Sequence, residues 1–344
     1  MKKQIIVASL ALGFGLAHTA ASAQSAGATV NVICSVQAEW CNLISTVYAK
    51  TTGVKINMSL KGSGEALAQI IAERENPKTD VWFGGTGDPH LQAAEQNLTL
   101  EYQSALMPQL QGWAQQQAQQ SKFKTVGIYS GPLGFGYNTE LLKKKNMPVP
   151  QTWEDLTKPI YKGEIQVANP ASSGTAYTMI ATLVQLMGED KAFDYMKRLH
   201  KNISQYTRSG TGPIKAAARG ETAVSISFIH DAPGEAMQGF PILALTPKDG
   251  TGAEIGSMSL IKGAKNLEAA KKFYDWALSA SAQELGAAAK QFQVPANKGS
   301  KVDSHVPDFK KIKFINYDYA KYGASTERRR LIAKWEKEVN SLPR

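Results

Sequence analysis

A group of small hydroxylated residues is the first feature of this sequence that could do chemistry. Residues 168–178 read Ala-Asn-Pro-Ala-Ser-Ser-Gly-Thr-Ala-Tyr-Thr, between a predicted strand and a predicted helix. The first backbone N–H groups of a helix have no partner within it and carry partial positive charge, so they attract an anion. A simple helix cap is the plain alternative, since serine is a preferred N-cap residue. The candidate anion-binding residues are Ser172, Ser173, Gly174 and Thr175.

His230 and Asp231, which follow a second predicted strand, are the most reactive pair of residues in the chain. A histidine beside an aspartate suits acid–base catalysis, as in a secreted hydrolase. No nucleophile accompanies the pair, because Ser172 and Ser173 lack the Gly-x-Ser-x-Gly context. The pair can instead bind sugar hydroxyls, since a carboxylate accepts hydrogen bonds and neutral imidazole accepts or donates one; a solvated turn is the third reading. Glu254 is either a further contact of this kind or a surface carboxylate.

The two groups of residues together favour one ligand chemistry. Carboxylates beside a phosphate would repel it, so a cradle of hydroxyls and N–H groups that is separate from the carboxylates suits a sugar phosphate better than a bare anion or a neutral sugar. The sequence has no His-Glu-x-x-His, no phosphate loop that ends in Gly-Lys-Ser/Thr and no dinucleotide fingerprint after a first strand. We therefore expect a binding protein rather than an enzyme, with no metal and no cofactor.

Strands and helices alternate in the first part of the chain, and these elements must position the candidate residues. Apolar runs predict strands over residues 30–34 and 80–84, and an alternation of apolar and polar residues predicts one over residues 54–60. Each strand is followed by a helix. This order with short connections predicts an α/β fold with a mainly parallel sheet covered on both faces. Ligands collect at the carboxyl ends of such strands. We expect the site to include the polar residues at the three strand ends, which are Ser35, Ser63 and Thr86.

The alternation breaks after residue 124, where two strand-like pieces follow one another. We interpret residues 126–129 and 133–137 as the crossing into a second lobe, and residues 250–261 as the return. Two lobes joined by two hinge strands form a cleft, and a solute that touches both lobes favours the closed state. The predicted division is lobe 1 over residues 24–130 and 253–303 and lobe 2 over residues 131–252 and 304–344.

Two long segments outside the alternating part read as helical. Residues 96–124 are amphipathic and rich in glutamine, which predicts a surface helix without a site, and residues 303–344 predict a helical tail. The tail contains the densest basic run, Arg328-Arg329-Arg330, which we interpret as a solvated face. The chain has no dense basic stripe with interleaved aromatic residues, so nucleic acid is not an expected partner.

The first 23 residues are typical of a secretory signal, with Lys2 and Lys3 before an apolar stretch and a small-residue cleavage pattern. No cysteine for a lipid anchor lies at the cleavage point, so a soluble protein in the periplasm is expected. The formal net charge of +10 favours anionic small ligands or an anionic membrane surface. Cys34 and Cys41, the two cysteines, are expected to form a disulfide in an oxidising compartment.

The order of several motifs resembles the extracellular solute-binding proteins of ABC importers, in the branch grouped with ferric-ion binders. The motifs are Gly-Ser-Gly at 62–64, Asp-Val-Trp-Phe-Gly-Gly at 80–85, Gly-Phe-Gly-Tyr-Asn at 134–138, Ala-Asn-Pro-Ala-Ser-Ser-Gly-Thr at 168–175 and Gly-Glu-Thr-Ala-Val at 220–224. This resemblance implies a two-lobed periplasmic binding protein of type II, in which each lobe is a mixed, mainly parallel sheet flanked by helices. It also implies a monomer that delivers its solute to an inner-membrane permease and its ATPase.

The ligand that the resemblance implies depends on residues 230 and 231. Ferric binders of this family hold iron with consecutive tyrosines at this point, where the present sequence has His230 and Asp231. A histidine and an aspartate here, with Glu254 farther on, resemble the hexose-phosphate binders of the group. Glucose-6-phosphate or a related sugar phosphate is thus implied, with these three residues on the sugar. Ferric iron and other small solutes, of the phosphonate or thiamine type, are the alternative.

Overall fold

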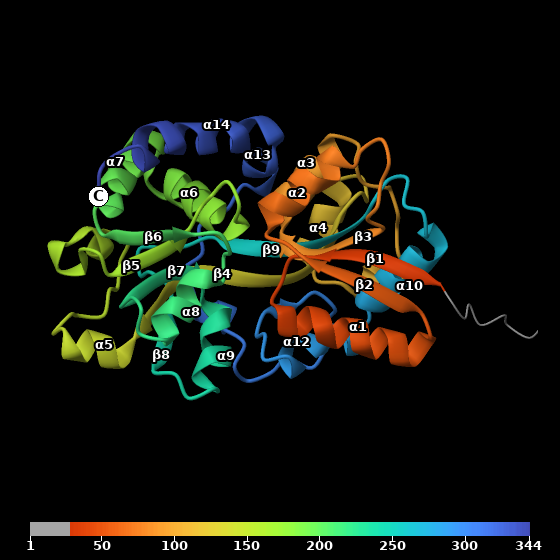
Figure 1. The fold of residues 1–344 in the computed structure, drawn as a ribbon, viewed down its shortest axis with the longest axis horizontal. Coiled ribbons are helices and arrows are strands. Elements are labelled where there is room, and N and C mark those ends of the chain that lie inside the picture. The colour runs from red at the N-terminus through yellow and green to blue at the C-terminus, as the bar shows by residue number, and fades with distance from the viewer. Residues whose placement is uncertain (1–27) are drawn as a thin grey trace, which may run out of the picture.

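The computed structural model describes residues 28–344, and the predicted secretory signal lies outside this range. Two lobes of strands and helices lie side by side (Figure 1), as the sequence predicted. One path of paired strands, in the order β2-β1-β3-β9-β4-β7-β5-β6, runs through both lobes. Within the described range, no helix has the length and apolar character needed to cross a membrane.

Lobe 1 is built on three parallel strands, of which β1 and β3 are mostly buried and the edge strand β2 is mostly exposed. β1 pairs in parallel with β2 and β3, and the antiparallel strand β9 follows β3. The carboxyl ends of β1, β2 and β3 face the second lobe. The elements of this part are β1 (Thr29–Cys34), α1 (Ala38–Thr52), β2 (Lys55–Leu60), α2 (Ser63–Ala72), β3 (Val81–Thr86), α3 (Gly87–Glu95), α4 (Gly112–Gln120), α10 (Leu267–Ala277), α11 (Ala280–Gln283), α12 (Leu285–Ala288) and β10 (Val294–Pro295).

Lobe 2 has a similar plan, in which β5 pairs in parallel with β6 and β7. Helix α6 begins directly after β5 and the hydroxylated loop, so the loop lies at a strand end as predicted. Strand β6 was not predicted from the sequence. The elements of this part are α5 (Thr139–Lys144), β5 (Ile165–Ala168), α6 (Gly174–Met187), α7 (Glu189–His200), β6 (Ile203–Thr207), α8 (Gly212–Ala218), β7 (Val224–Phe228), α9 (Ala232–Ala236), β8 (Ile242–Leu245), α13 (Tyr319–Gly323) and α14 (Ser325–Trp335).

Two long strands connect the lobes at the centre of Figure 1, namely β4 (Val126–Asn138) and β9 (Ala253–Leu260). The first half of β4, residues 126–132, pairs with β9, and the second half, residues 133–138, pairs with β7 and β8. The two strand pieces expected from the sequence are therefore one continuous strand that belongs to both lobes. β4 and β9 are the hinge strands of the molecule, while the lobe boundaries themselves stay a prediction.

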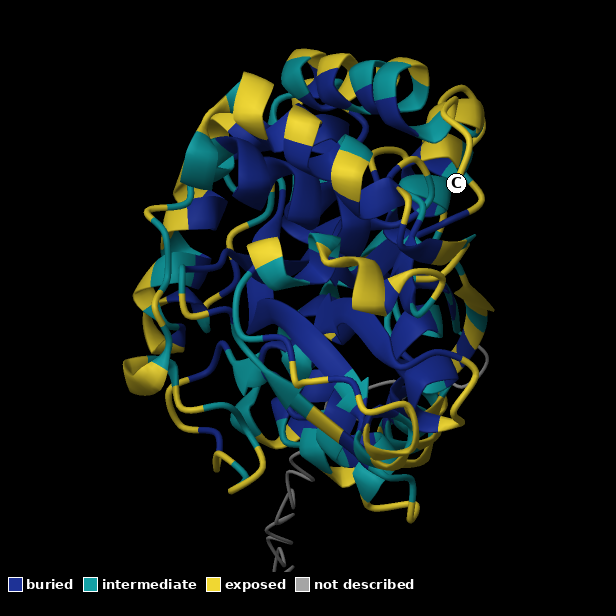
Figure 2. Ribbon diagram, turned by 90° about the vertical axis from the view of Figure 1, so that its left-hand side faces the viewer, coloured by how far each residue is buried: buried dark blue, intermediate teal, exposed yellow. Residues whose placement is uncertain are grey.

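Each lobe has its own hydrophobic core, and buried residues fill the interior while exposed ones lie on the outer helices (Figure 2). In lobe 1, Trp40 of α1 packs edge-on against Phe83 of β3, with ring centroids 5.7 Å apart. In lobe 2, Phe135 of β4 packs edge-on against Trp153, with ring centroids 5.0 Å apart. Separate cores let each lobe move as a unit about the hinge strands.

Cys34 and Cys41 form a disulfide, which ties the end of β1 to the first turn of α1. The bridge closes a short loop that contains Ser35 and Gln37. The side chain of Trp82 fixes the same loop from β3, because its Nε1 donates a hydrogen bond to Ser35 Oγ at 2.9 Å. The loop that ends β1 is therefore held from two sides.

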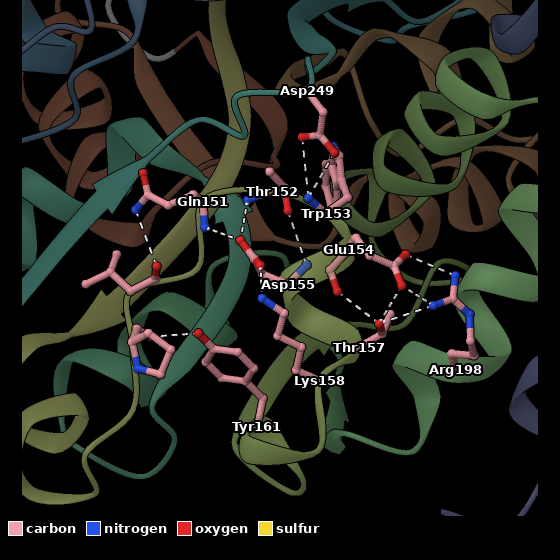
Figure 3. Close-up of polar contacts among 12 residues, drawn as sticks. Gln151, Thr152, Trp153, Glu154, Asp155, Thr157, Lys158, Tyr161, Arg198 and Asp249 are labelled. Atoms are coloured by element: carbon pink, nitrogen blue, oxygen red, sulfur yellow. Dashed lines mark hydrogen bonds and ion pairs between the residues drawn. The ribbon is translucent and has the colours of Figure 1, made fainter.

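The segment after α5 is fastened to lobe 2 by Trp153, as Figure 3 shows. The buried indole donates from Nε1 to the carbonyl of Gly250 at 2.9 Å, and its backbone N–H donates to the carboxylate of Asp249 at 3.1 Å. Asp155 accepts from the backbone N–H groups of Gln151 and Thr152, at 2.9 and 3.0 Å, and so closes the turn. These bonds join the segment to the chain shortly before β9 begins.

The predictions of two long helices, over residues 96–124 and 303–344, are largely wrong. Within residues 96–124, only α4 and one 3₁₀ turn are helical, because Pro108 and the left-handed backbone at Phe123 (φ 57°) do not fit a continuous helix. The tail becomes helical only from Tyr319 onward, apart from one 3₁₀ turn. Arg328, expected on a solvated face, is buried with 6% of its surface exposed.

Candidate functional site

A cavity of about 520 Å³ lies between the lobes at the carboxyl ends of the strands. Nine of the ten candidate ligand residues line it, although their part in binding a ligand stays a prediction. They come from the loops after β1, β2, β3, β5 and β7 and from the hinge strand β9. These residues are Ser35, Ser63, Thr86, Ser173, Gly174, Thr175, His230, Asp231 and Glu254.

At one end of the cavity, which we call the anion end, three helices begin. α2 and α3 of lobe 1 and α6 of lobe 2 each have residues of their first turn or cap in the cavity wall. Each of these helices is at least 9 residues long, so its dipole places partial positive charge at this end. Three helix N-termini from two lobes thus face one space, which is an arrangement that favours a bound anion.

The hydroxyls at the anion end have hydrogen-bonding capacity that the fold leaves unsatisfied. Thr86 and Ser173 hold the N-cap positions of α3 and α6, but neither side chain caps its helix. Thr86 Oγ1 is buried without a hydrogen-bond partner. Ser63 Oγ accepts a hydrogen bond from the backbone N–H of Thr86 at 3.2 Å, so its own proton is free to be donated. The anion end therefore offers neutral donors, and the carboxylates nearest to it, those of Glu65 and Asp88, are each paired with an arginine, Arg208 and Arg328.

Ser172 has a different place from its neighbours, since it does not line the cavity. Its hydroxyl donates to the carbonyl of Arg208 at 2.8 Å, and its own carbonyl accepts from the backbone N–H of Gly64 at 3.3 Å. The second bond crosses from lobe 2 to lobe 1. Beside it, Gly174 lies so close to lobe 1 that a Cβ there would be 1.7 Å from Thr86 Oγ1. The lobes are in direct contact around the anion end.

At the other end, which we call the acid end, an imidazole lies between two carboxyl groups. His230 Nε2 is 3.6 Å from Asp231 Oδ1 and 3.6 Å from Glu254 Oε1. His230 and Asp231 belong to the 3₁₀ turn after β7, and Glu254 lies on β9 opposite Gly131 of β4. A Cβ at Gly131 would be 2.0 Å from His230 Nδ1, so a residue without a side chain is required for the imidazole to reach this position.

Burial decides the protonation of the acid end. Burial lowers the pKa of His230 to about 3, so the imidazole is neutral at pH 7. Burial raises the pKa of Asp231 to about 7, against the opposing effect of the positive charge of Lys215. Burial, with the nearby charge of Asp231, raises the pKa of Glu254 well above its usual range. The imidazole and the two carboxyl groups can therefore both donate and accept hydrogen bonds, which suits the hydroxyls of a sugar.

The structure also brings residues to the cavity that the sequence analysis did not select. Gln37 Nε2, from lobe 1, donates a hydrogen bond to Asp231 Oδ1 of lobe 2. Arg208, after β6, forms an ion pair with Glu65 of α2 at the mouth of the anion end. Lys215 of α8 lines the cavity as well. The polar run at residues 207–211 marks the end of β6, and it would have pointed to Arg208 had that strand been predicted.

The acid end lacks the partners that catalysis would need. In the part of the chain that the structure describes, His230 forms no hydrogen bond to a serine or threonine hydroxyl, and its Nδ1 has no partner. The same part contains no group of three His, Cys, Asp or Glu side chains placed to hold a metal ion. The geometry fits hydrogen bonding to a ligand better than proton transfer from a nucleophile.

Known proteins share both the sequence and the fold. The model of the bacterial extracellular solute-binding protein family matches residues 76–322. An uncharacterised protein of Haemophilus influenzae is 43% identical over 98% of each chain. Among solved structures, the periplasmic binding protein AfuA from Actinobacillus pleuropneumoniae, with exogenous fructose-6-phosphate bound, is 46% identical with a TM-score of 0.90, over 92% of this chain and 100% of AfuA. The periplasmic binding protein P5PA is 39% identical with a TM-score of 0.87, over 91% of this chain and 99% of P5PA.

These matches confirm the expected fold and the predicted class of protein, which is a binding component of transport and not an enzyme. The family model covers well over half of the chain, and the similar structures span nearly all of it. This chain therefore belongs to the family of bacterial extracellular solute-binding proteins.

Proposed function

We propose that this protein, a periplasmic solute-binding component of an ABC transporter, captures a sugar phosphate in the cavity between its lobes. Glucose-6-phosphate or a related hexose phosphate is the proposed ligand, and an inner-membrane permease with its ATPase receives it. The fructose-6-phosphate bound to the similar protein AfuA supports this choice.

The observation that carries the proposal is the separation of two chemistries within one cavity. The anion end has three helix N-termini and free hydroxyls, whereas the acid end has His230, Asp231 and Glu254. A phosphoryl group at the anion end meets neutral donors, and the ring hydroxyls at the acid end meet carboxyl and imidazole groups. The reverse orientation would bring a phosphate dianion against two carboxyl groups, which repel it as soon as either ionises.

Calorimetry with matched ligands tests this assignment. Glucose-6-phosphate and fructose-6-phosphate are titrated into the purified protein, and inorganic phosphate and glucose are titrated separately as the two halves of the ligand. We expect one site per chain that binds at least one of the sugar phosphates with micromolar or tighter affinity, and weak binding of each half alone. The absence of heat and of any thermal shift with both sugar phosphates would refute the proposal.

The same purified protein distinguishes the sugar phosphate from iron. A ferric site with phenolate ligands is coloured, and a chelator removes the colour. Tyr129 is the phenol among the residues that line the cavity, and its hydroxyl already accepts a hydrogen bond from the backbone N–H of Gly85 at 3.0 Å. We therefore expect no new visible absorbance when ferric citrate is added, and a coloured, chelator-sensitive complex would replace our proposal with an iron carrier.

A further inference from the structure

Arg328 of helix α14 is a buried arginine with three partners. Its Nε donates to Asp88 Oδ2 at 3.0 Å, and its Nη2 donates to the carbonyl of Pro170 at 3.3 Å. The guanidinium carbon is 5.1 Å from the centre of the Tyr177 ring, which is within the range of a cation–π contact. Arg328 is absent from the cavity wall. Its contacts therefore serve the fold around the cavity rather than a ligand directly.

The partners of Arg328 come from both lobes and lie next to the anion end. Asp88 is in the first turn of α3 in lobe 1, two residues after Thr86. Pro170 lies in the loop that leads to Ser173, and Tyr177 is in the first turn of α6 in lobe 2. One guanidinium thus touches the elements that carry the proposed phosphate donors of the two lobes.

Other contacts of α13 and α14 also reach both lobes. The backbone N–H of Ser325 donates to Glu95 Oε2 of α3 at 2.9 Å, and the hydroxyl of Tyr177 in α6 donates to the carbonyl of Tyr322 at 2.7 Å. The tail is therefore hydrogen-bonded to one helix of each lobe. Figure 1 shows α13 and α14 along the top of the molecule, with α6 below them and α3 beside α13.

We propose that Arg328 is a positioning residue for the closed cleft, and that α13–α14 forms a non-covalent connection between the lobes. Arg328 holds α3 of lobe 1 against α6 of lobe 2 and the loop of residues 169–173 that precedes it, so that Thr86 and Ser173 face one ligand. This inference rests on the proposed function only where a sugar phosphate is the readout. The chain itself crosses between the lobes in the hinge strands β4 and β9 and again between β10 and α13, and the contacts of α13–α14 with α3 and α6 restrict the angle between the lobes.

The physical reason is the high cost of an unpaired buried charge. Asp88 and Arg328 have only 12% and 8% of their side chains exposed, so neither charge is well solvated. If α3 moved away from α14, each would lose its partner before water could fully replace it. The pair therefore favours the arrangement of lobes in which α3, α6 and α14 meet, and shifts the population towards the closed state.

The experiment compares Arg328→Gln with Arg329→Gln. Arg329 is the adjacent residue of the same helix, is exposed, and has no ion pair among the described residues, so it is a matched control for loss of one positive charge. Spin labels at Lys50→Cys in lobe 1 and Lys201→Cys in lobe 2, both exposed, report the distance between the lobes. Calorimetry with glucose-6-phosphate and fructose-6-phosphate reports the affinity.

We expect Arg328→Gln to broaden the interlobe distances of the protein without ligand and to weaken sugar-phosphate binding about tenfold or more, because the apparent affinity falls with the fraction of closed protein. Arg328→Lys, which keeps the charge, is expected to restore part of both properties, and Arg329→Gln to match the parent. If Arg328→Gln does not fold, Arg328→Lys and Asp88→Asn are compared with the parent by the same two measurements.

A lower unfolding temperature with unchanged interlobe distances and unchanged affinity would overturn the proposal, since it would show a purely structural ion pair. The distance measurement needs no ligand. If the parent binds neither sugar phosphate, the proposed function fails, while broadened distances in Arg328→Gln still support the positioning role.

Discussion

Replacing Gly174 by alanine tests whether the lobes meet at the anion end when a ligand is bound. The added methyl group would lie 1.7 Å from Thr86 Oγ1 and 2.7 Å from Thr86 Cβ, whereas ordinary contact begins at 3.4 Å. Because Thr86 belongs to lobe 1 and Gly174 to lobe 2, the lobes must separate by more than about 1 Å, or Thr86 must rotate. Either change displaces hydrogen-bond donors in the cavity wall, which both residues line.

The expected loss follows from hydrogen-bond geometry. A bond of about 2.9 Å that lengthens by more than 1 Å is no longer a hydrogen bond. One lost hydrogen bond to a charged phosphoryl group costs about 1.5–3 kcal/mol, which corresponds to roughly a tenfold to hundredfold weaker affinity. Alanine is a better helix former than glycine, so the first turn of α6 is not destabilised by the change itself.

Gly112→Ala is the matched control, because no atom lies within 4 Å of a Cβ at this first residue of α4. Calorimetry with the sugar phosphate and thermal unfolding are measured for both variants. We expect Gly174→Ala to bind weakly yet unfold near the temperature of the parent, and Gly112→Ala to match the parent in both. Parental affinity in Gly174→Ala would show that the ligand-bound lobes do not meet at Thr86, and would refute the described geometry of the closed anion end.

Three further changes have expected outcomes. Asp231→Ala should weaken sugar-phosphate binding roughly tenfold to hundredfold and leave inorganic phosphate unaffected in calorimetry; equal loss for both ligands would contradict the acid-end assignment. Burial raises the pKa of Asp231 in the folded protein to about 7, whereas the carboxyl of the unfolded chain titrates near pH 4. Between these two values only the folded protein holds the proton, so the free energy of unfolding falls as the pH rises from about 4 towards 7. Urea unfolding from pH 4 to 7 should show this decline in the parent and a smaller one in Asp231→Asn. Identical pH profiles of the two proteins would refute the raised pKa of Asp231. Reduction of the Cys34–Cys41 disulfide should lower the free energy of unfolding by about 2–3 kcal/mol, and a Cys34→Ser/Cys41→Ser variant should not respond to the reductant.

Much of the site could be predicted because it follows local rules. Ser35, Ser63 and Thr86 stand at the ends of strands in lobe 1, and Ser173 stands between a strand and a helix in lobe 2. Each is therefore placed at the carboxyl edge of the strands of its own lobe, whatever the details of packing. The crossings in β4 and β9 were also predicted, the first because the alternation of strands and helices stops there.

The missed features depend on contacts between distant parts of the chain. Arg328 was assigned to a solvated face because charged runs usually are, and only the packing of α14 against α3, 240 residues away, buries it. Gln37 is 194 residues from Asp231, and nothing in its local sequence indicates that bond. The expected helix over residues 96–124 failed because local backbone at Pro108 and Phe123 overrode an amphipathic pattern.

The antiparallel pairing of β9 with β3 bears on how the protein is made. β9 starts at Ala253, so one edge of the strand Val81–Thr86 stays uncovered until a further 167 residues (253 − 86) have been made. A sheet edge with Val81, Trp82 and Phe83 is prone to pair with another chain while it is open. One edge of β3 therefore stays open until residue 253 of the 344 has been made, and a nascent chain that stalls before this point exposes an edge that can pair with another chain.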